Sequence, residues 1–304
     1  ISRKGSTGSM AVEGRSIPYD PGEIVDNLHR ERYLQDGYQG IAGKRLVRDL
    51  YYALRPALPV RLRSYAQRMS LRGWQKKTFP VWPVDATADQ LLEEVLATAM
   101  QTSGVTEVPF IWFWPLGHNA AVIMTHDVET GEGLRSCDAL MRTDTSYGIP
   151  ASFQLVPAER YPVSDSVLDQ MRGQGFEVNV HDWNHDGHLF RDEETFRTRA
   201  EKIEGVRRKW HAEGFRAAVL YRNTEWIETL GFAYDMSVPC VGHLDPQPGG
   251  CCTVFPWFLG KTLEIPLTTT QDYSLFHFLQ EYSTALWVAQ LSSIQARHGL
   301  ASFI

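Results

Sequence analysis

The sequence predicts an α/β fold, with six or seven β/α units that form a barrel-like sheet, preceded by a basic and mainly helical N-terminal extension. From residue 86 onward, short apolar runs alternate with longer helical patterns, which is typical of β/α units. A chain of 304 residues that is 43% hydrophobic and 22% charged also buries a sizeable core without a disulfide or metal. We therefore divide the chain into an extension, residues 1–85, and a barrel, residues 86–304.

Apolar runs mark the strands of this barrel. The predicted strands are 120–125, 151–156, 176–180, 215–221, 263–267 and 300–304, with a weaker one at 233–237. Helices are expected between them at 134–147, 164–173, 192–212, 223–230 and 275–297. Acidic residues begin the helix at 192–212 and basic residues end it, as the helix dipole favours. In such folds the functional residues follow the carboxyl ends of the strands.

Charge is distributed unevenly along the chain. The formal net charge of -6 argues against general binding of nucleic acid. Residues 41–80 nevertheless contain ten Lys and Arg residues against Asp49 alone, and apolar residues recur at helical spacing within this stretch. Such a helix either packs on the barrel with a solvated basic face or makes peripheral contact with a membrane or anionic polymer. Both possibilities stay open.

The sequence also bears on the compartment. No run approaches the roughly 18 apolar residues that span a bilayer, and the first twenty residues lack the apolar segment of a secretory signal. The four cysteines include the adjacent pair Cys251 and Cys252, which is unsuited to a disulfide framework. We expect a reduced, cytoplasmic protein, with membrane association only through residues 41–80.

Two polar segments follow predicted strands. The first is Thr125-His126-Asp127-Val128-Glu129, in which Asp127 and Glu129 share one face of the strand and His126 turns to the other. The second begins with His181 and His185, which are four residues apart. Each segment alone is a weak signal, because a carboxylate at a strand end often caps the next helix. Together they supply two imidazoles and a carboxylate, the ligands of a catalytic metal site.

These segments, with Phe215-Arg216, resemble motifs one to three of the polysaccharide deacetylases, the NodB-homology family also called carbohydrate esterase family 4. The resemblance covers about residues 105–304. It implies a distorted seven-stranded β/α barrel of NodB-homology type. It also implies a divalent ion, usually zinc and alternatively cobalt or nickel, held by one carboxylate and two histidines, with a second carboxylate as base and an arginine that orients it.

Carried over to this sequence, the resemblance makes Asp127 the base, Arg216 its partner, and Glu129, His181 and His185 the metal ligands. The reverse assignment of Asp127 and Glu129 stays open. The implied function is the hydrolytic removal of N-acetyl or other acyl groups from an amino sugar or polysaccharide by metal-activated water. The implied partner is therefore a carbohydrate.

Three positions depart from the family pattern. Val128 separates the two acidic residues, as in a branch of the family with an Asp-x-Glu motif. Asp182 stands where a hydroxyl residue usually follows the first histidine, and Ala217-Ala218 replaces a proline after the motif-three arginine. The family's general acid, a histidine, would come just after the strand at 300–304. We expect it in a segment beyond Ile304, because His298 lies at the other edge of the sheet.

Other classes of protein fit parts of the pattern. The His-Asp pairs invite comparison with metal-dependent phosphohydrolases, whose ligands lie on helices of an all-helical domain. A ferrous oxygenase also uses two histidines and a carboxylate. A hydrolase of another small amide, or a carbohydrate-binding relative that has lost its catalytic activity, is compatible with the motifs. Trp183, Tyr221 and Trp226 lie near the motifs and either stack on a sugar or pack in the core.

Overall fold

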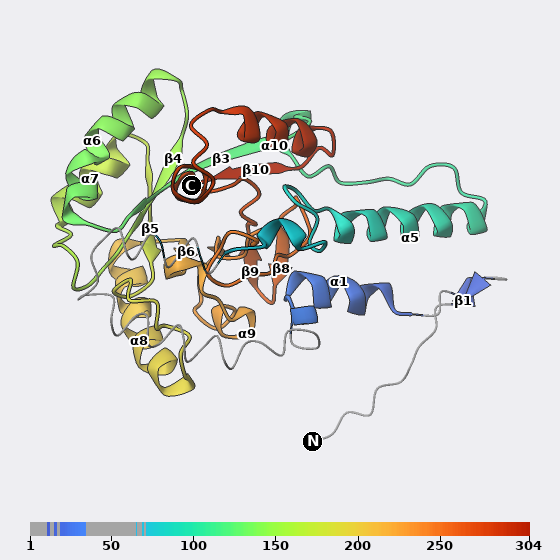
Figure 1. Ribbon diagram of the computed structural model, residues 1–304, viewed down its shortest axis with the longest axis horizontal. Coiled ribbons are helices and arrows are strands. Elements are labelled where there is room, and N and C mark those ends of the chain that lie inside the picture. Colours follow the sequence, from blue (N-terminus) through green and yellow to red (C-terminus); the bar gives the residue numbers. More distant parts are fainter. Residues whose placement is uncertain (1–10, 13–14, 17–18, 35–64, 66–68, 70) are drawn as a thin grey trace.

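The structure is a computed structural model that describes residues 11–12, 15–16, 19–34, 65, 69 and 71–304 (Figure 1). Most of the basic stretch 41–80 lies outside these residues, so contact with a membrane or polymer through it stays a prediction. Within the described ranges, no helix has both the length and the apolar character needed to cross a bilayer.

The central feature is a sheet of eight strands in the order β10-β3-β4-β5-β6-β7-β9-β8. Neighbouring strands are parallel except β8 and β9, which form an antiparallel hairpin. The strands are β3 (Ala121–Val128), β4 (Ala151–Leu155), β5 (Glu177–His181), β6 (Gly214–Arg216), β7 (Tyr234–Asp235), β8 (Trp257–Leu259), β9 (Thr262–Glu264) and β10 (Leu300–Phe303). A separate short hairpin pairs β1 (Ala11–Val12) with β2 (Arg15–Ser16).

The sheet curls so that its two ends approach each other. The segment that follows β9 reaches β10, where the Thr268 hydroxyl donates to the Leu300 carbonyl at 2.7 Å and the Thr269 amide to the Ser302 carbonyl at 3.3 Å. The predicted α/β fold is thus confirmed, and the sheet is curled and mostly parallel, with eight strands where a seven-stranded barrel was predicted. The hairpin strand β8 was not predicted.

Helices cover the outer side of this sheet, and α6, α7 and α8 flank β4 and β5 in Figure 1. In α6, α7 and α8 a side chain caps the first turn, and these side chains are Thr130, Ser164 and Asp192 respectively. Between these helices and the sheet lies the largest core cluster, which includes Phe153 and Ile203. The helices are α1 (Pro21–His29), α5 (Thr87–Ser103), α6 (Gly131–Ser146), α7 (Asp165–Gly173), α8 (Glu193–Trp210), α9 (Thr224–Ile227) and α10 (Ala285–Gln295).

Two of the predicted elements are interrupted in the structure. The strand expected at 215–221 ends at Arg216, because the chain turns into the 3-10 helix η4 (Ala218–Leu220) with Val219 at φ 58°. The helix expected at 275–297 is split into a π-helical segment, η5 (Ser274–Leu279), and α10. Gln280, at φ 55°, ends the first piece, since a left-handed residue cannot continue a right-handed helix.

The helix α1 is joined to the barrel by a buried ion pair. The Arg222 guanidinium donates to both carboxylate oxygens of Glu31, at 2.7 and 2.5 Å, and neither side chain is more than 5% exposed. The Gly250 amide donates to the same carboxylate at 2.6 Å. Glu31, two residues beyond the end of α1, thus contacts a loop of the barrel. The division of the chain into an extension and a barrel at residues 85 and 86 stays a prediction.

Candidate metal centre

Three predicted ligands meet at the carboxyl edge of the sheet. Glu129 follows β3, His181 ends β5 and His185 lies in the loop beyond it. One donor atom from each of the three lies within 4.8 Å of the others. The His185 Nε2 atom is 3.1 Å from Glu129 Oε1, and the centroids of the two imidazole rings are 4.7 Å apart. The strand order explains why these residues lie close together, because β3 and β5 are separated only by β4.

The His181 ring is held in the orientation that a metal ligand needs. Its Nδ1 atom lies 3.1 Å from the Arg216 carbonyl oxygen, so Nδ1 carries the proton and Nε2 presents its lone pair. The Nε2 atom is buried and has no hydrogen-bond partner. The carboxylate oxygen Oδ2 of Asp127 lies 3.6 Å from this nitrogen, beyond hydrogen-bonding distance. A buried nitrogen of this kind is costly unless it binds something.

The loop that carries His185 has an unusual backbone. Asp182 and His185 have φ values of 57° and 55°, in the left-handed region that side chains rarely adopt. Arg160 holds this conformation by donating to the carbonyls of Asn184, at 3.0 Å, and His185, at 2.5 Å. Local strain of this sort persists only where surrounding contacts fix it.

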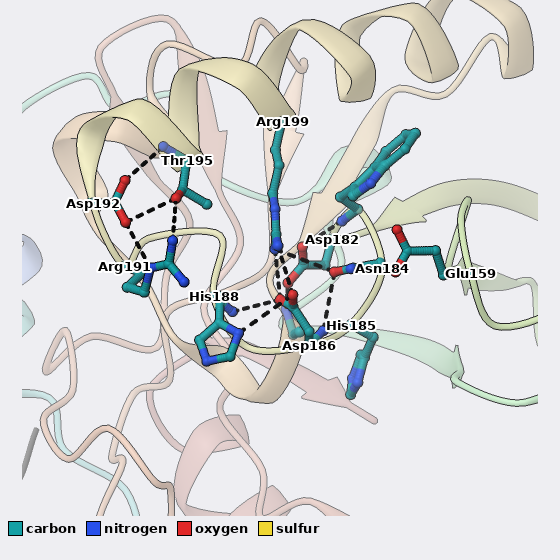
Figure 2. Close-up of polar contacts among 12 residues, drawn as sticks. Glu159, Asp182, Asn184, His185, Asp186, His188, Arg191, Asp192, Thr195 and Arg199 are labelled. Carbon is teal, nitrogen blue, oxygen red and sulfur yellow. Dashed lines mark hydrogen bonds and ion pairs between the residues drawn. The ribbon is translucent and has the colours of Figure 1, made fainter. Parts of the chain in front are cut away.

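A second arginine fixes the same loop from α8. Figure 2 shows Arg199 pointing down from α8 onto the carboxylate of Asp186, where two hydrogen bonds of 2.6 and 2.7 Å form. Asp186 in turn accepts from the His188 amide at 2.8 Å. The contacts of Asp186 with Arg199 and with the His188 amide therefore fix the loop of residues 182–188 in place. His188, whose Nδ1 lies 3.5 Å from Asp186, belongs to this network rather than to the ligand set.

Asp127 lies beside the three donors and is held by Arg216. The Arg216 side chain is fully buried, and its Nη1 donates to Asp127 Oδ1 at 2.7 Å and to the Thr125 hydroxyl at 2.8 Å. Its Nε donates to the Met236 carbonyl at 3.1 Å. A guanidinium fixed at several points orients the carboxylate it contacts.

The charges of the site stabilise ionised carboxylates. Burial alone raises the pKa of Asp127, but the charge of the Arg216 guanidinium, the largest opposing cause, helps to bring this pKa below its ordinary value. Burial likewise opposes ionisation of Glu129, yet its contact with His185 lowers its pKa. Burial lowers the pKa of His181, which favours the neutral imidazole that a metal requires.

Asp182, at the position where the resembled motif has a hydroxyl residue, makes hydrogen bonds of its own. Its carboxylate accepts from the Trp183 amide at 2.5 Å and from the Ala218 amide at 3.3 Å. It therefore ties the histidine loop to the turn that follows Arg216. The resemblance implied that the contact of the usual hydroxyl was either replaced or lost, and the sequence did not show which partners Asp182 has.

The remaining candidates make contacts outside the donor set. His126 is on the opposite face of β3, as predicted, where its Nε2 lies 2.8 Å from Asp144. Trp226 packs against Phe196 at a centroid distance of 5.1 Å, and Trp183 packs on the same core cluster. Both tryptophans are partly buried and pack against this cluster. Tyr221 is buried as well.

Sequence reasoning assigned no role to several residues that support the site. They are Thr125, Arg160, Asp186, Arg199 and the carbonyl of Met236. Arg199 lies on α8, where a basic residue looks like ordinary helix surface. Thr125 was visible within the first motif, and only its place two residues before Asp127 on the same strand face hinted at its contact.

The residues present fit a divalent ion. The donor set consists of two imidazole nitrogens and one carboxylate oxygen, and His181 Nε2 lacks any other partner. Three protein ligands leave positions for water and substrate, which distinguishes catalytic from structural zinc sites. Glu129 is 51% exposed, so the site is open to solvent on that side.

A comparison with solved structures finds similarity to a crystal structure of another protein. No family model matches the chain, and no curated protein matches it. A crystal structure from Mycobacterium smegmatis, described as a "putative polysaccharide deacetylase", is 18% identical, with a TM-score of 0.47. The match covers 65% of this chain and 80% of that chain. The function proposed below rests on the residues of the site.

Proposed function

We propose that the chain is a metal-dependent hydrolase that removes an N-acetyl or other acyl group from an amino sugar or polysaccharide. One observation carries the proposal: a donor set of Glu129, His181 and His185 lies next to a carboxylate, Asp127, that a buried arginine keeps ionised. The choice of an acylated amino sugar comes from the resemblance of the three sequence motifs.

Glu129, His181 and His185 would hold the ion. Imidazole and carboxylate ligands in a three-residue set favour zinc, and cobalt or nickel also suits them. Glu129 is the better ligand of the two carboxylates, because Oδ1 of Asp127 is already committed to Arg216 at 2.7 Å. When bound, the ion would polarise the acyl carbonyl and lower the pKa of a bound water.

Asp127 would act as the general base. Its ionised carboxylate accepts the proton of the attacking water while the water oxygen bonds to the acyl carbon. Arg216 keeps Asp127 charged and in place, and it does not contact the acyl group in this role. The amine nitrogen gains one proton as the carbon–nitrogen bond breaks, which balances the proton that Asp127 removes.

The test is metal content together with acetate release. The metal-free chain is loaded in turn with zinc, cobalt and nickel and offered a panel of N-acetylated glycans. We expect about one bound ion per chain, a higher melting temperature with metal, and turnover. His181→Ala should lose both the ion and turnover, whereas His118→Ala, at an exposed position outside the site, should keep both.

Other outcomes identify other functions. Full activity in His181→Ala would contradict the proposal. Tight glycan binding by the metal-loaded chain without turnover identifies a carbohydrate-binding relative. Turnover that requires ferrous ion and oxygen identifies an oxygenase. The all-helical phosphohydrolase class is already excluded, since His126 and His181 lie on strands.

A further inference from the structure

An apolar loop, residues 108–117, lies in the chain between α5 and β3. It contains no charged residue, and its only polar side-chain groups are the indole N–H groups of two tryptophans. Figure 1 shows this chain running back from the end of α5 toward β3. Ile111 is 93% exposed and Leu116 is 95% exposed, the highest values among the large hydrophobic side chains of the described residues. An exposed apolar segment of this length is a candidate interaction surface.

The two tryptophans fasten the apolar loop to the rest of the chain. The Trp112 indole Nε1 donates to the His118 carbonyl at 2.7 Å, and the Trp114 Nε1 donates to the His298 carbonyl at 2.6 Å. Both indole N–H groups therefore have partners within the chain. The apolar loop offers no side-chain donor or acceptor that needs a partner outside it, which is the condition for a surface that enters an apolar phase.

Leu116 has a backbone conformation that disfavours a leucine. Its φ is 57°, within the short 3-10 segment η3 (Pro115–Gly117), and this left-handed region favours Gly and Asn. Backbone strain of this kind persists where other contacts compensate for it, yet the exposed Leu116 side chain gains almost no contact within the described residues. An apolar surface outside the chain would supply the contact that the chain itself does not.

A lipid bilayer suits the apolar loop better than a groove on a protein or on a second copy of this chain. Side chains as exposed as Ile111 and Leu116 project from the surface, and a fluid acyl phase accepts them without a matching shape. Protein interfaces also carry about one hydrogen bond per 100–200 Å², for which the apolar loop has no free side-chain group. Trp and Phe, both present in the apolar loop, pack well at the boundary between lipid and water.

The charge of the chain is a second observation in favour of a bilayer. Residues 41–80 contain ten Lys and Arg residues against Asp49 alone, and anionic phospholipids attract such a segment. Tyr65 and Met69, two described residues of the apolar face predicted within this stretch, are 60% and 37% exposed. Side chains packed on the barrel would be buried, so these two remain available to a membrane surface.

We propose that the apolar loop binds the surface of an anionic phospholipid bilayer, with Ile111 and Leu116 inserted among the acyl chains. The apolar loop precedes β3, whereas Glu129 follows β3 and His181 ends β5. Because β3, β4 and β5 are parallel, the apolar loop and the donor set lie at opposite edges of the sheet. The donor set therefore stays outside the membrane contact. No metal ligand takes part, so the proposal does not depend on the proposed function.

The test is sedimentation of the full chain with phospholipid vesicles. Vesicles of phosphatidylcholine with phosphatidylserine should bind more tightly than pure phosphatidylcholine, and high salt should reduce the difference. Ile111→Ser and Leu116→Asn should each weaken binding by at least about tenfold, because each removes an aliphatic side chain from the acyl phase. Leu116→Asn should keep or raise the melting temperature, since Asn tolerates a positive φ. A loss of binding in this variant is therefore separate from misfolding.

An attached fluorophore reports the insertion directly. All four native cysteines are buried, so a thiol-reactive, environment-sensitive dye labels the cysteine of Ile111→Cys selectively. We expect its emission to shift to the blue when vesicles are added. Tyr282, which is 76% exposed and precedes α10, provides the matched control. A dye at Tyr282→Cys should not shift, and Tyr282→Ser should bind vesicles as the native chain does.

Two kinds of result would overturn the proposal. The first is unchanged vesicle binding in Ile111→Ser and Leu116→Asn, or an equal loss in Tyr282→Ser. The second is a dimer of the native chain that Leu116→Asn dissociates, without vesicle binding, as measured by analytical ultracentrifugation. That result would assign the apolar loop to contact with a second copy of the chain.

Discussion

Arg216 contacts more parts of the site than any other single side chain described above. Its guanidinium holds Asp127 and the Thr125 hydroxyl, and its backbone carbonyl accepts from His181. One residue at the end of β6 thus sets the orientation of both the proposed base and one proposed ligand. The guanidinium is also fully buried, so it depends on Asp127 for its nearest counter-charge.

A pair of variants separates the roles of the two carboxylates. Asp127→Asn should retain the ion and lose about 10²- to 10⁴-fold in kcat, because general-base catalysis contributes that much. Glu129→Gln should instead lose the ion, because an amide oxygen is a weaker ligand than a carboxylate. Metal content by mass spectrometry and single-turnover acetate release measure the two effects. If Asp127→Asn is metal-free and Glu129→Gln retains the ion, the two roles are reversed.

At the scale of elements, the loop between β5 and α8 determines where His185 lies. Its left-handed residues are held by Arg160 and by the pair of Asp186 with Arg199. None of these groups belongs to the donor set. Outer contacts of this kind fix the geometry of ligands and affect metal affinity.

The pair of Asp186 with Arg199 offers a direct test. Asp186→Asn should lower metal affinity by about 10- to 100-fold, the usual effect of losing an outer contact. It should also lower the free energy of unfolding by about 1–3 kcal/mol, because a partly buried charged hydrogen bond is lost. Metal titration and urea unfolding measure these effects.

Glu193→Gln is the matched control for that test. Glu193 forms an ion pair of 2.6 Å with Arg197 on the exposed surface of the same helix, α8. The loss there should stay below about 1 kcal/mol, since exposed pairs contribute little. Equal metal affinity in Asp186→Asn and Glu193→Gln would show that the loop needs no support from Arg199.

The helices and strands also show how much of the fold and of the site could be predicted from the sequence. Apolar runs predicted most strands to within a few residues, because a parallel sheet buries its strands on both faces. The strand at 215–221 was overestimated, since its apolar composition conceals a turn held by Asp182, a contact distant in sequence. The donor residues were predictable because strand ends meet at one edge. Arg160 and Arg199 were not, because their partners depend on tertiary packing.

For the molecule as a whole, the buried pair of Glu31 with Arg222 links the N-terminal segment to the barrel. Glu31→Gln should lower the free energy of unfolding by about 3–5 kcal/mol, because the fully buried Arg222 guanidinium loses the carboxylate with which it forms its ion pair. Urea unfolding followed by circular dichroism measures the loss. The double variant Glu31→Leu with Arg222→Leu should be less destabilised than Glu31→Gln, since it removes both charges.

Glu228→Gln controls for the general effect of removing a carboxylate. Glu228 pairs with Arg30, a neighbour of Glu31, at 3.1 Å, and its side chain is 37% exposed. A partly exposed pair should contribute no more than about 1 kcal/mol. A loss in Glu31→Gln that is no larger than in Glu228→Gln would mean that Arg222 finds another partner.

The separation of Glu31 from Arg222 also bears on the order of folding during synthesis. The two residues are 191 positions apart, so Glu31 leaves the ribosome long before its partner exists. At a synthesis rate of roughly 5–20 residues per second, about 10–40 seconds pass between them. The segment of α1 and Glu31 therefore lacks its contact with Arg222 while β3 to β6 are synthesised. The same holds for the first strand of the sheet, β3, whose neighbour β10 is made last. Newly made chains thus expose the edge of β3 that later pairs with β10, and the end of α1, longer than the other strand pairs of the sheet.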